Sequence, residues 1–239
     1  MYVHRTFLGP VELAFTDRHG GVSAAPFDSL NLALEGADDP SSLAQNLRLV
    51  HGDFASGASL RDMRQVHGAE AVLVDGGSSG GRPHCDGLVS TQPDVVLMVR
   101  AADCAPVLLA DPGRGVVAAA HSGRLGLAKG IVPAVVRLMR EQGAERITAW
   151  IGPHVCGSCY EVPLAVQQEV VALEAASLAT TSWGTPALDI GAGVRAQLER
   201  VEVTVVDASR CTRESPDLYS HRRDGAGAGR LAGLIRIRP

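Results

Sequence analysis

Aromatic residues are scarce in this chain, so a buried core cannot be built around them. Only 4% of the 239 residues are Phe, Trp or Tyr, whereas hydrophobic residues of all kinds make up 46%. The sequence therefore predicts a large core of aliphatic side chains, mainly Val, Leu, Ala and Ile. A chain of this length can form one or two compact units, and we expect a single domain covering residues 1–239.

A basic excess is also missing. The formal charge is −4, and the densest basic run is His221-Arg222-Arg223. Proteins that bind nucleic acids normally carry clustered Lys and Arg side chains. We therefore expect no nucleic-acid partner.

Membrane and export signals are absent from the sequence as well. No run of about 18 uninterrupted apolar residues occurs, so no membrane-spanning helix is expected. The N-terminal residues MYVHR are not followed by the long apolar stretch of a signal peptide. The five cysteines are an odd number and do not suggest a disulfide framework. We expect a soluble, cytoplasmic protein with reduced thiols and no membrane partner.

Strands and helices are mixed along the chain without strict alternation. Apolar runs predict strands at residues 11–15, 71–74, 95–99, 105–110, 116–120, 147–151 and 203–206. Caps and periodicity predict helices at residues 39–51, 127–142, 163–178 and 189–200. Pro133 predicts a kink or a later start in the second helix. The glycine-rich residues 76–81 suit a surface connection, and the whole pattern favours a layered α/β or α+β domain.

Two of these strands predict a hairpin with reactive residues at its open end. A turn of sequence DPGRG separates residues 105–110 from 116–120. If the turn is centred in this segment, Pro106 lies opposite His121, and Cys104 lies one diagonal step away on the same face. Diagonal neighbours have Cβ atoms roughly 7–8 Å apart, so their side chains can converge on one ion. A slip of one residue would separate them.

A third segment, RQVHG, supplies His67 in a similar setting. Together with Cys104 and His121 it would form a Cys-His₂ set that suits zinc, and three protein ligands leave the open position of a catalytic site. An open zinc lowers the pKa of bound water to about 7. Alternatively, Cys104 and His121 form a nucleophilic pair with Asp103 or Asp86 orienting the imidazole. The spacing leaves both interpretations open.

A C-x-x-C motif at Cys156 and Cys159 is typical of half a zinc site or of a redox pair. A structural zinc site would need a second paired set, and Cys85 and Cys211 are isolated in the sequence. We therefore expect a loop near the active site with incidental thiols. The GAGAG stretch at residues 225–229 follows no clear strand and does not predict a phosphate loop.

Four arginines could bind an anion such as phosphate, because a guanidinium makes bidentate contacts. They are Arg18, Arg124, Arg222 and Arg223. Solvated surface positions are an equally good interpretation for each of them.

A series of short motifs resembles the laccase-domain family, also named polyphenol oxidase or peptidoglycan editing factor. The motifs are FTDRHGGVS, SLNL, QVHG, CDGLVS, ADCAPVL, AHSG, IGP, CYEV, CT and SHRRDG, in this order between residues 15 and 225. Each motif is short, but their common order makes the resemblance specific from about residue 11 to the C-terminus.

The resemblance implies an activity, a fold and a metal site. Members of the family are described as zinc-dependent purine nucleoside phosphorylases that act on adenosine, inosine and methylthioadenosine and also deaminate adenosine. The family's metal ligands correspond to His67, Cys104 and His121. The implied fold is a layered α/β/β/α sandwich of mixed sheets, shared with toxin deamidases that use a Cys–His pair. The expected partners are a purine nucleoside and phosphate, with the protein as a monomer or small homo-oligomer.

On this basis we assign catalysis to Cys104, His121 and Asp103, with Asp103 moving protons. Substrate binding is assigned to Arg18, Gln65, Arg222 and Arg223. The chain departs from the family near the site. The family usually has Trp-Arg-Gly after His-Ala-Gly, whereas here the basic residue, Arg124, follows Ser122-Gly123 and is displaced by one position. Ala102 and Asp17 also stand where the family usually has Thr.

Three alternatives remain open at this stage. Cys104 could act as the nucleophile of an amidase that edits peptidoglycan precursors. A copper-dependent, laccase-like oxidase is weaker, because eight histidines do not supply multicopper sites and a Cys-His₂ set suits zinc better than copper. The chain could also be a non-catalytic metal-binding protein.

Overall fold

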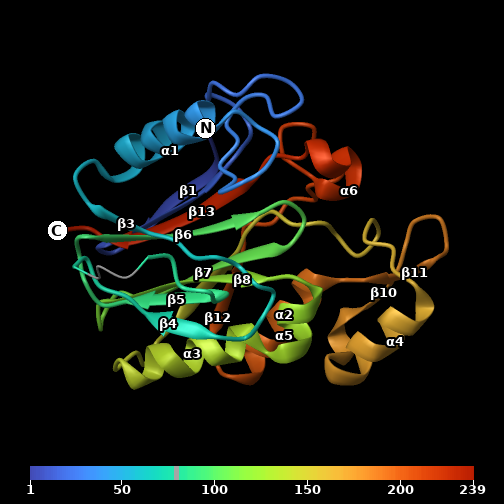
Figure 1. The fold of residues 1–239 in the computed structure, drawn as a ribbon. Helices are drawn as coiled ribbons and strands as arrows, with labels where there is room; N and C mark the ends of the chain where they lie inside the picture. Colours follow the sequence, from blue (N-terminus) through green and yellow to red (C-terminus); the bar gives the residue numbers. More distant parts are fainter. Residues whose placement is uncertain (78–80) are drawn as a thin grey trace.

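Two mixed β-sheets lie face to face in the computed structural model, which describes residues 1–77 and 81–239 (Figure 1). The first sheet has, in spatial order, β1 (Tyr2–Leu8), β2 (Val11–Thr16), β13 (Leu231–Ile237), β6 (Val95–Ala101) and β3 (Ser59–Arg61). The second has β12 (Thr204–Asp207), β9 (Thr148–Ile151), β7 (Ala105–Asp111), β8 (Val116–Ser122), β5 (Gly87–Ser90) and β4 (Ala71–Leu73). A separate pair consists of β10 (Leu178–Thr180) and β11 (Pro186–Leu188).

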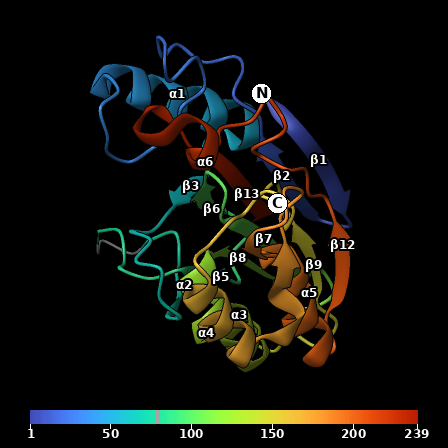
Figure 2. The same ribbon diagram turned by 90° about the vertical axis from the view of Figure 1, so that its right-hand side faces the viewer.

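Helices cover the outer faces of both sheets. The helices are α1 (Pro40–Ala55), α2 (Arg124–Lys129), α3 (Ile131–Glu141), α4 (Leu164–Leu173), α5 (Ile190–Arg200) and α6 (His221–Asp224), with 3₁₀ turns η1 (Ala175–Ser177) and η2 (Gly225–Gly227). In Figures 1 and 2, α1 lies over the first sheet, and α2, α3 and α5 lie under the second. This order of layers confirms the α/β/β/α sandwich. No helix in the described part of the chain is long and apolar enough to cross a membrane.

The central strands are buried on both faces, which explains their continuous apolar sequences. In β7, Leu108 belongs to the core between the sheets, and its neighbours Val107 and Leu109 belong to the core under the helices. In β6, Leu97 faces the second sheet while Met98 packs in the cluster with α1. Successive side chains along each strand point to opposite faces of the sheet, so each strand contributes to the core between the sheets and to a core under the helices.

The register of the β7–β8 hairpin is the one predicted from the sequence. Pro106 is paired with His121, and Asp111 is paired with Val116. The hairpin therefore ends with Cys104 just before β7 and His121 near the end of β8. Because of this register, the side chains of Cys104 and His121 lie close together.

Two predicted helices were wrong in part. The helix at residues 127–142 is two helices, α2 and α3, because Gly130 adopts a left-handed φ of +77° between them. The later helix start predicted from Pro133 is confirmed, because α3 begins at Ile131 and Pro133 lies in its first turn, where proline is tolerated. The helix at residues 163–178 ends at Leu173, because Glu174 turns to an extended φ of −140° and its buried carboxylate bonds to Arg200 at 3.1 Å.

The other predicted helices and strands are present with small shifts of their ends. Asp39 caps α1 by accepting from the Ser42 N–H at 2.8 Å, and Asp189 caps α5 by accepting from the Ala192 N–H at 2.8 Å. Of the surface connection predicted at residues 76–81, residues 78–80 lie outside the described part of the chain.

Candidate metal centre

His67, Cys104 and His121 meet at one end of the second sheet. One ligand atom from each lies within 4.8 Å of the others. The two imidazole rings have centroids 4.9 Å apart and stand edge to face, at 80°. His121 is buried, Cys104 is half-buried and His67 is exposed, so the group opens to solvent on the side of His67.

Asp86, directly before β5, holds this group together. Its carboxylate contacts Nδ1 of His121 at 2.8 Å and accepts the backbone N–H groups of Val66, His67 and Gly68 at 3.1, 3.1 and 2.7 Å. These three bonds fix the loop in which His67 adopts a left-handed φ of +56°. An ionised carboxylate only accepts hydrogen bonds, so Nδ1 of His121 donates and Nε2 is left for a ligand. Such a contact orients the imidazole and raises its basicity.

The electrostatics favour a thiolate at Cys104. Burial alone would raise the pKa of this thiol, but the charges and hydrogen bonds of His121 and His67 outweigh burial and lower it. Burial alone would lower the pKa of His121, but the Cys104 thiolate and Asp86 outweigh burial and raise it. A thiolate is both a metal ligand and a nucleophile. The lowered pKa of Cys104 is therefore compatible with a metal site and with a nucleophilic Cys–His pair.

Gly123 makes room for the ligands. A Cβ atom at this position would lie 2.7 Å from Cys104 Sγ and 3.2 Å from His67 Cδ2. Real carbon and sulfur atoms do not approach so closely without bonding. Glycine therefore lets the chain leave β8 and start α2 without displacing the Cys104 and His67 side chains.

A cavity of about 540 Å³ adjoins the three ligands. Its polar lining includes Gln65, Asp103, Tyr160, Arg222 and Arg230 besides the ligands, and its apolar lining includes Ala33, Leu34 and Met63. The volume and the mixed lining are those of a site for a small molecule.

Asp103 and Arg222 are brought to the cavity as predicted. Asp103 has a left-handed φ of +87° and accepts from Thr212 Oγ1 at 2.5 Å and from the backbone N–H of Arg222 at 2.6 Å. The Arg222 guanidinium lies over the ring of Tyr160, 4.6 Å from its centroid. Asp103 does not bond to His121, so of the two candidates for orienting that imidazole the structure selects Asp86.

The other predicted substrate residues are engaged elsewhere. Gln65 lines the cavity, but its amide is taken up by the backbone of Arg100, with distances of 2.8 and 2.9 Å. Arg18 and Arg223 do not line the cavity. Arg18 donates to the Asp28 carbonyl at 2.7 Å, and Arg223 bonds to Asp224 and to four backbone carbonyls.

Sequence reasoning did not find Tyr160, Arg100 or Arg230 as cavity residues. Arg100 is buried, bonded to Asp62 at 2.8 Å, and its Nη1 has no partner among the described residues. An arginine inside the apolar run of β6 was the available signal for Arg100, because a charged side chain is rarely buried without a partner or a function. No comparable signal marks Arg230, which precedes β13.

The donors present fit a zinc ion. Sulfur and imidazole nitrogen are ligands that zinc prefers, and three protein ligands are the number found in catalytic zinc sites. The partner of His121 fits too, because metal-bound imidazoles usually donate their second N–H to a carboxylate or carbonyl. The site can therefore hold a metal next to a cavity that carries cationic side chains.

Residues 12–238 match the family described as multi-copper polyphenol oxidoreductase laccase. This chain belongs to that family. It is 48% identical to a Streptomyces coelicolor protein named purine nucleoside phosphorylase, over 98% of this chain and 99% of that protein. It is 43% identical to a Mycobacterium tuberculosis protein of the same name, over 92% of this chain and 89% of that protein.

Solved structures of similar proteins have the same fold. The crystal structure of Neisseria meningitidis protein NMB0706 has a TM-score of 0.87 and 29% identity, and the match covers 99% of each chain. The structure of YlmD from Geobacillus stearothermophilus has a TM-score of 0.86 and 30% identity, over 96% of this chain and 93% of that chain. The resemblance inferred from the motifs is thus confirmed.

Proposed function

We propose that this chain is a zinc-dependent purine nucleoside phosphorylase acting at the centre formed by His67, Cys104 and His121. Adenosine, inosine and methylthioadenosine are the proposed substrates, with deamination of adenosine as a further activity. The observation that carries the proposal is the convergence of these three ligands beside a cavity lined by arginines. The family's description names copper, but each potential metal group among the described residues offers at most two histidines. Such a donor set favours zinc.

The arginines of the cavity are suited to phosphate. Arg222 and Arg230 line it, and neither has a carboxylate bonded to its guanidinium among the described residues. Arginine binds phosphate through several N–H donors at once. We therefore assign phosphate to Arg222, as predicted, and add Arg230. Arg18 and Arg223 remain predictions without support from the position of their side chains.

The reaction transfers the ribosyl group from the purine to phosphate. A phosphate oxygen bonds to the anomeric carbon, the bond from that carbon to the purine nitrogen breaks, and its electron pair stays with the purine, which takes up a proton. Asp103 lines the cavity and is the residue proposed to move protons; its hydrogen bonds to Thr212 and Arg222 fix its position. A bound zinc would supply Lewis-acid polarisation of an oxygen.

The test is to incubate the purified protein with adenosine, with and without inorganic phosphate, and to separate the products by chromatography. Phosphorolysis gives adenine only when phosphate is present, whereas deamination gives inosine in either case. His67→Ala and removal of metal should abolish both. The matched control is His19→Ala, because His19 is exposed and does not line the cavity. Purine activity that persists in His67→Ala would contradict the zinc mechanism.

A cysteine-dependent amidase is the second candidate, favoured by one observation. Cys104, His121 and Asp86 form the nucleophile, base and orienting carboxylate of a cysteine hydrolase. The same preparation should be offered a muramoyl-amino-acid substrate. Cleavage of that substrate by metal-free protein, with purines left intact, would establish the amidase. The cytoplasmic location and the state predicted from the sequence, a monomer or a small homo-oligomer, remain part of our proposal.

A further inference from the structure

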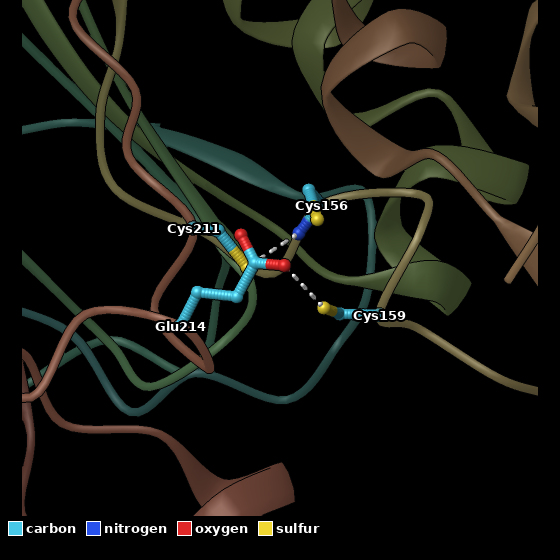
Figure 3. A group of neighbouring side chains, drawn as sticks. All are labelled: Cys156, Cys159, Cys211 and Glu214. Atoms are coloured by element: carbon cyan, nitrogen blue, oxygen red, sulfur yellow. Dashed lines mark hydrogen bonds between the residues drawn. The ribbon is translucent and has the colours of Figure 1, made fainter. Parts of the chain in front are cut away.

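A second group of metal-binding side chains lies outside the cavity. It consists of Cys156, Cys159, Cys211 and Glu214, and one ligand atom from each lies within 4.8 Å of the others (Figure 3). The sequence showed only the first pair. The second pair, Cys211 and Glu214, has the same spacing of three residues but joins a thiol to a carboxylate, so a search for cysteine pairs misses it.

The two pairs come from segments that follow neighbouring parallel strands. Cys156 and Cys159 follow β9, and Cys211 and Glu214 follow β12. Beyond the strands, the segments stay paired through His154: its N–H donates to Arg210 O at 3.2 Å, and its carbonyl accepts from Thr212 N at 3.0 Å. Backbone pairing, not chance contact of side chains, therefore brings the four ligands together.

The backbone between the first two cysteines forms a tight turn that can present both thiols to one metal ion. The N–H groups of Cys159 and Tyr160 both donate to the Cys156 carbonyl at 3.0 Å, which closes the turn between the first two cysteines. The Cys156 N–H points at Cys211 Sγ at 3.5 Å, and Cys159 Sγ lies 3.3 Å from Glu214 Oε1 (Figure 3). Donors and acceptors of this kind orient ligands before a metal arrives.

A positive charge stabilises the second turn. The Arg223 guanidinium donates to the carbonyls of Thr212, Arg213 and Ser215 at 2.9, 3.3 and 3.0 Å. It thus holds the segment from Cys211 to Glu214 and places a cation near a group that becomes anionic when it binds metal. These bonds to backbone carbonyls explain why the Arg223 guanidinium is absent from the cavity.

We propose that Cys156, Cys159, Cys211 and Glu214 bind a second zinc ion, with a structural role. Three sulfurs and one carboxylate oxygen are ligands of zinc, and four protein ligands complete its tetrahedral shell, as in structural sites. The hard cations Mg²⁺ and Ca²⁺ need oxygen ligands and do not suit three thiolates. The first centre has three protein ligands and the second has four; one is open and the other closed.

The second ion would hold one wall of the cavity. Thr212 lies between Cys211 and Glu214 and donates to Asp103, and Tyr160 follows Cys159 and lines the cavity. Val155, just before the first cysteine, donates its N–H to the Asp103 carbonyl at 3.0 Å. The ion thus acts as a positioning element for Asp103, whatever reaction the cavity carries out.

The test is the zinc content of protein purified without chelator and measured by mass spectrometry of the metal. We expect two zinc ions per wild-type chain, one for each group. Cys211→Ser and the shape-conserving Glu214→Gln should each lose the second ion and keep the first, whereas His67→Ala should lose only the first. Cys85→Ala is the matched control, because Cys85 is buried outside both groups and should leave both ions bound.

Cobalt(II) in place of zinc distinguishes the two sites without an activity assay. Absorption from thiolate-to-cobalt charge transfer should come mainly from the group with three thiols, so it should fall strongly in Cys211→Ser and only slightly in Cys104→Ser. One zinc per wild-type chain, unchanged in Cys211→Ser, would overturn the proposal. So would a Cys156–Cys159 disulfide in protein alkylated without reductant, because the motif would then be a redox pair.

Discussion

Two residues that touch the three ligands, Asp86 and Gly123, decide their arrangement. Asp86 contributes four hydrogen bonds that reach both histidine segments, and Gly123 contributes the empty space that Cys104 and His67 need. Neither is itself in the ligand group, and both act by fixing where ligand atoms can lie. Their substitution should therefore alter metal binding before it alters the fold.

Gly123→Ala should prevent zinc from binding to the first centre. The added Cβ would stand 2.7 Å from Cys104 Sγ, so the sulfur has to leave its position in the ligand group. Metal analysis should show loss of this ion while circular dichroism remains that of the wild type. Gly81→Ala is the control, because no atom lies within 4 Å of its added Cβ. Full zinc content in Gly123→Ala would show that the ligands tolerate the displacement.

Asp86→Asn should weaken zinc binding roughly 10- to 100-fold, the usual effect of removing a carboxylate behind a metal-bound imidazole. The amide keeps the size of the side chain but no longer carries the charge that fixes the tautomer of His121. Competition with a chromophoric chelator measures the affinity. Asp53→Asn, on the exposed side of α1, should leave it unchanged. If Asp86→Asn and Asp53→Asn bound zinc with equal affinity, Asp86 would not support metal binding through His121.

At the scale of elements, the β7–β8 hairpin is the unit that delivers Cys104 and His121. Its far end is fixed by Asp111, whose carboxylate accepts the N–H groups of Gly113 and Arg114 in the turn, at 3.0 and 3.2 Å. The same carboxylate accepts the N–H groups of Glu145 and Arg146 ahead of β9, at 2.7 and 2.8 Å. One side chain thus joins three strands of the second sheet.

Asp111→Asn should lower the free energy of unfolding by about 2–3 kcal/mol at neutral pH, as expected for hydrogen bonds to a charged group. Burial alone would raise the pKa of Asp111, but the four N–H donors outweigh it and lower the pKa below 3.8. A depressed pKa in the folded state stabilises the protein above the unfolded pKa, and this contribution disappears as the pH falls through the folded value.

Urea unfolding of both proteins between neutral pH and about pH 3 measures this effect. The difference between wild type and Asp111→Asn should be constant near neutrality and should shrink below about pH 4. Asp94→Asn, at an exposed position, should show little difference at any pH. If the difference in free energy of unfolding between wild type and Asp111→Asn stayed constant in acid, the charge of Asp111 would not stabilise the hairpin.

At the scale of the whole molecule, the two sheets are joined by close packing between their inner faces. Phe15 of β2 packs directly on Gly152, the residue after β9. A Cβ at Gly152 would come within 2.3 Å of the Phe15 ring. The chain has few aromatic side chains, and the Phe15 ring is one of them. It fills the space between the two sheets beside Gly152 with its large apolar surface.

Gly152→Ala should lower the free energy of unfolding by roughly 1–3 kcal/mol, because a filled core has to shift to accept the methyl group. Gly52→Ala is the matched control in α1, where nothing lies within 4 Å of the added Cβ. It should raise stability by up to about 1 kcal/mol through helix propensity. Denaturant melts of both variants measure the change. Equal changes in the free energy of unfolding for Gly152→Ala and Gly52→Ala would show that the sheets move apart easily at Gly152.

The sequence by itself determined the features that depend on neighbours along the chain. Asp39 and Asp189 mark helix starts, continuous apolar runs mark the central strands, and a short turn fixes the register that brings Cys104 near His121. Local hydrogen bonds and side-chain periodicity decide these features, so a short window of sequence contains the information. The RQVHG segment offered His67 as a third candidate ligand, and the ordered motifs between residues 15 and 225 supplied its match to the family's metal ligands and the α/β/β/α layers.

Only the tertiary structure decided which distant segments meet. β13, at the C-terminal end, is inserted between β2 and β6, and no local pattern names those partners. In the proposed second site, Cys156 lies beside Cys211, 55 residues away, together with a carboxylate that no cysteine search could find. Such contacts depend on how buried faces of remote strands pack together, and that energy is shared among many residues. The sequence therefore identified the residues of the first candidate centre, while the pairing of β9 with β12 brings together the residues of the proposed second site.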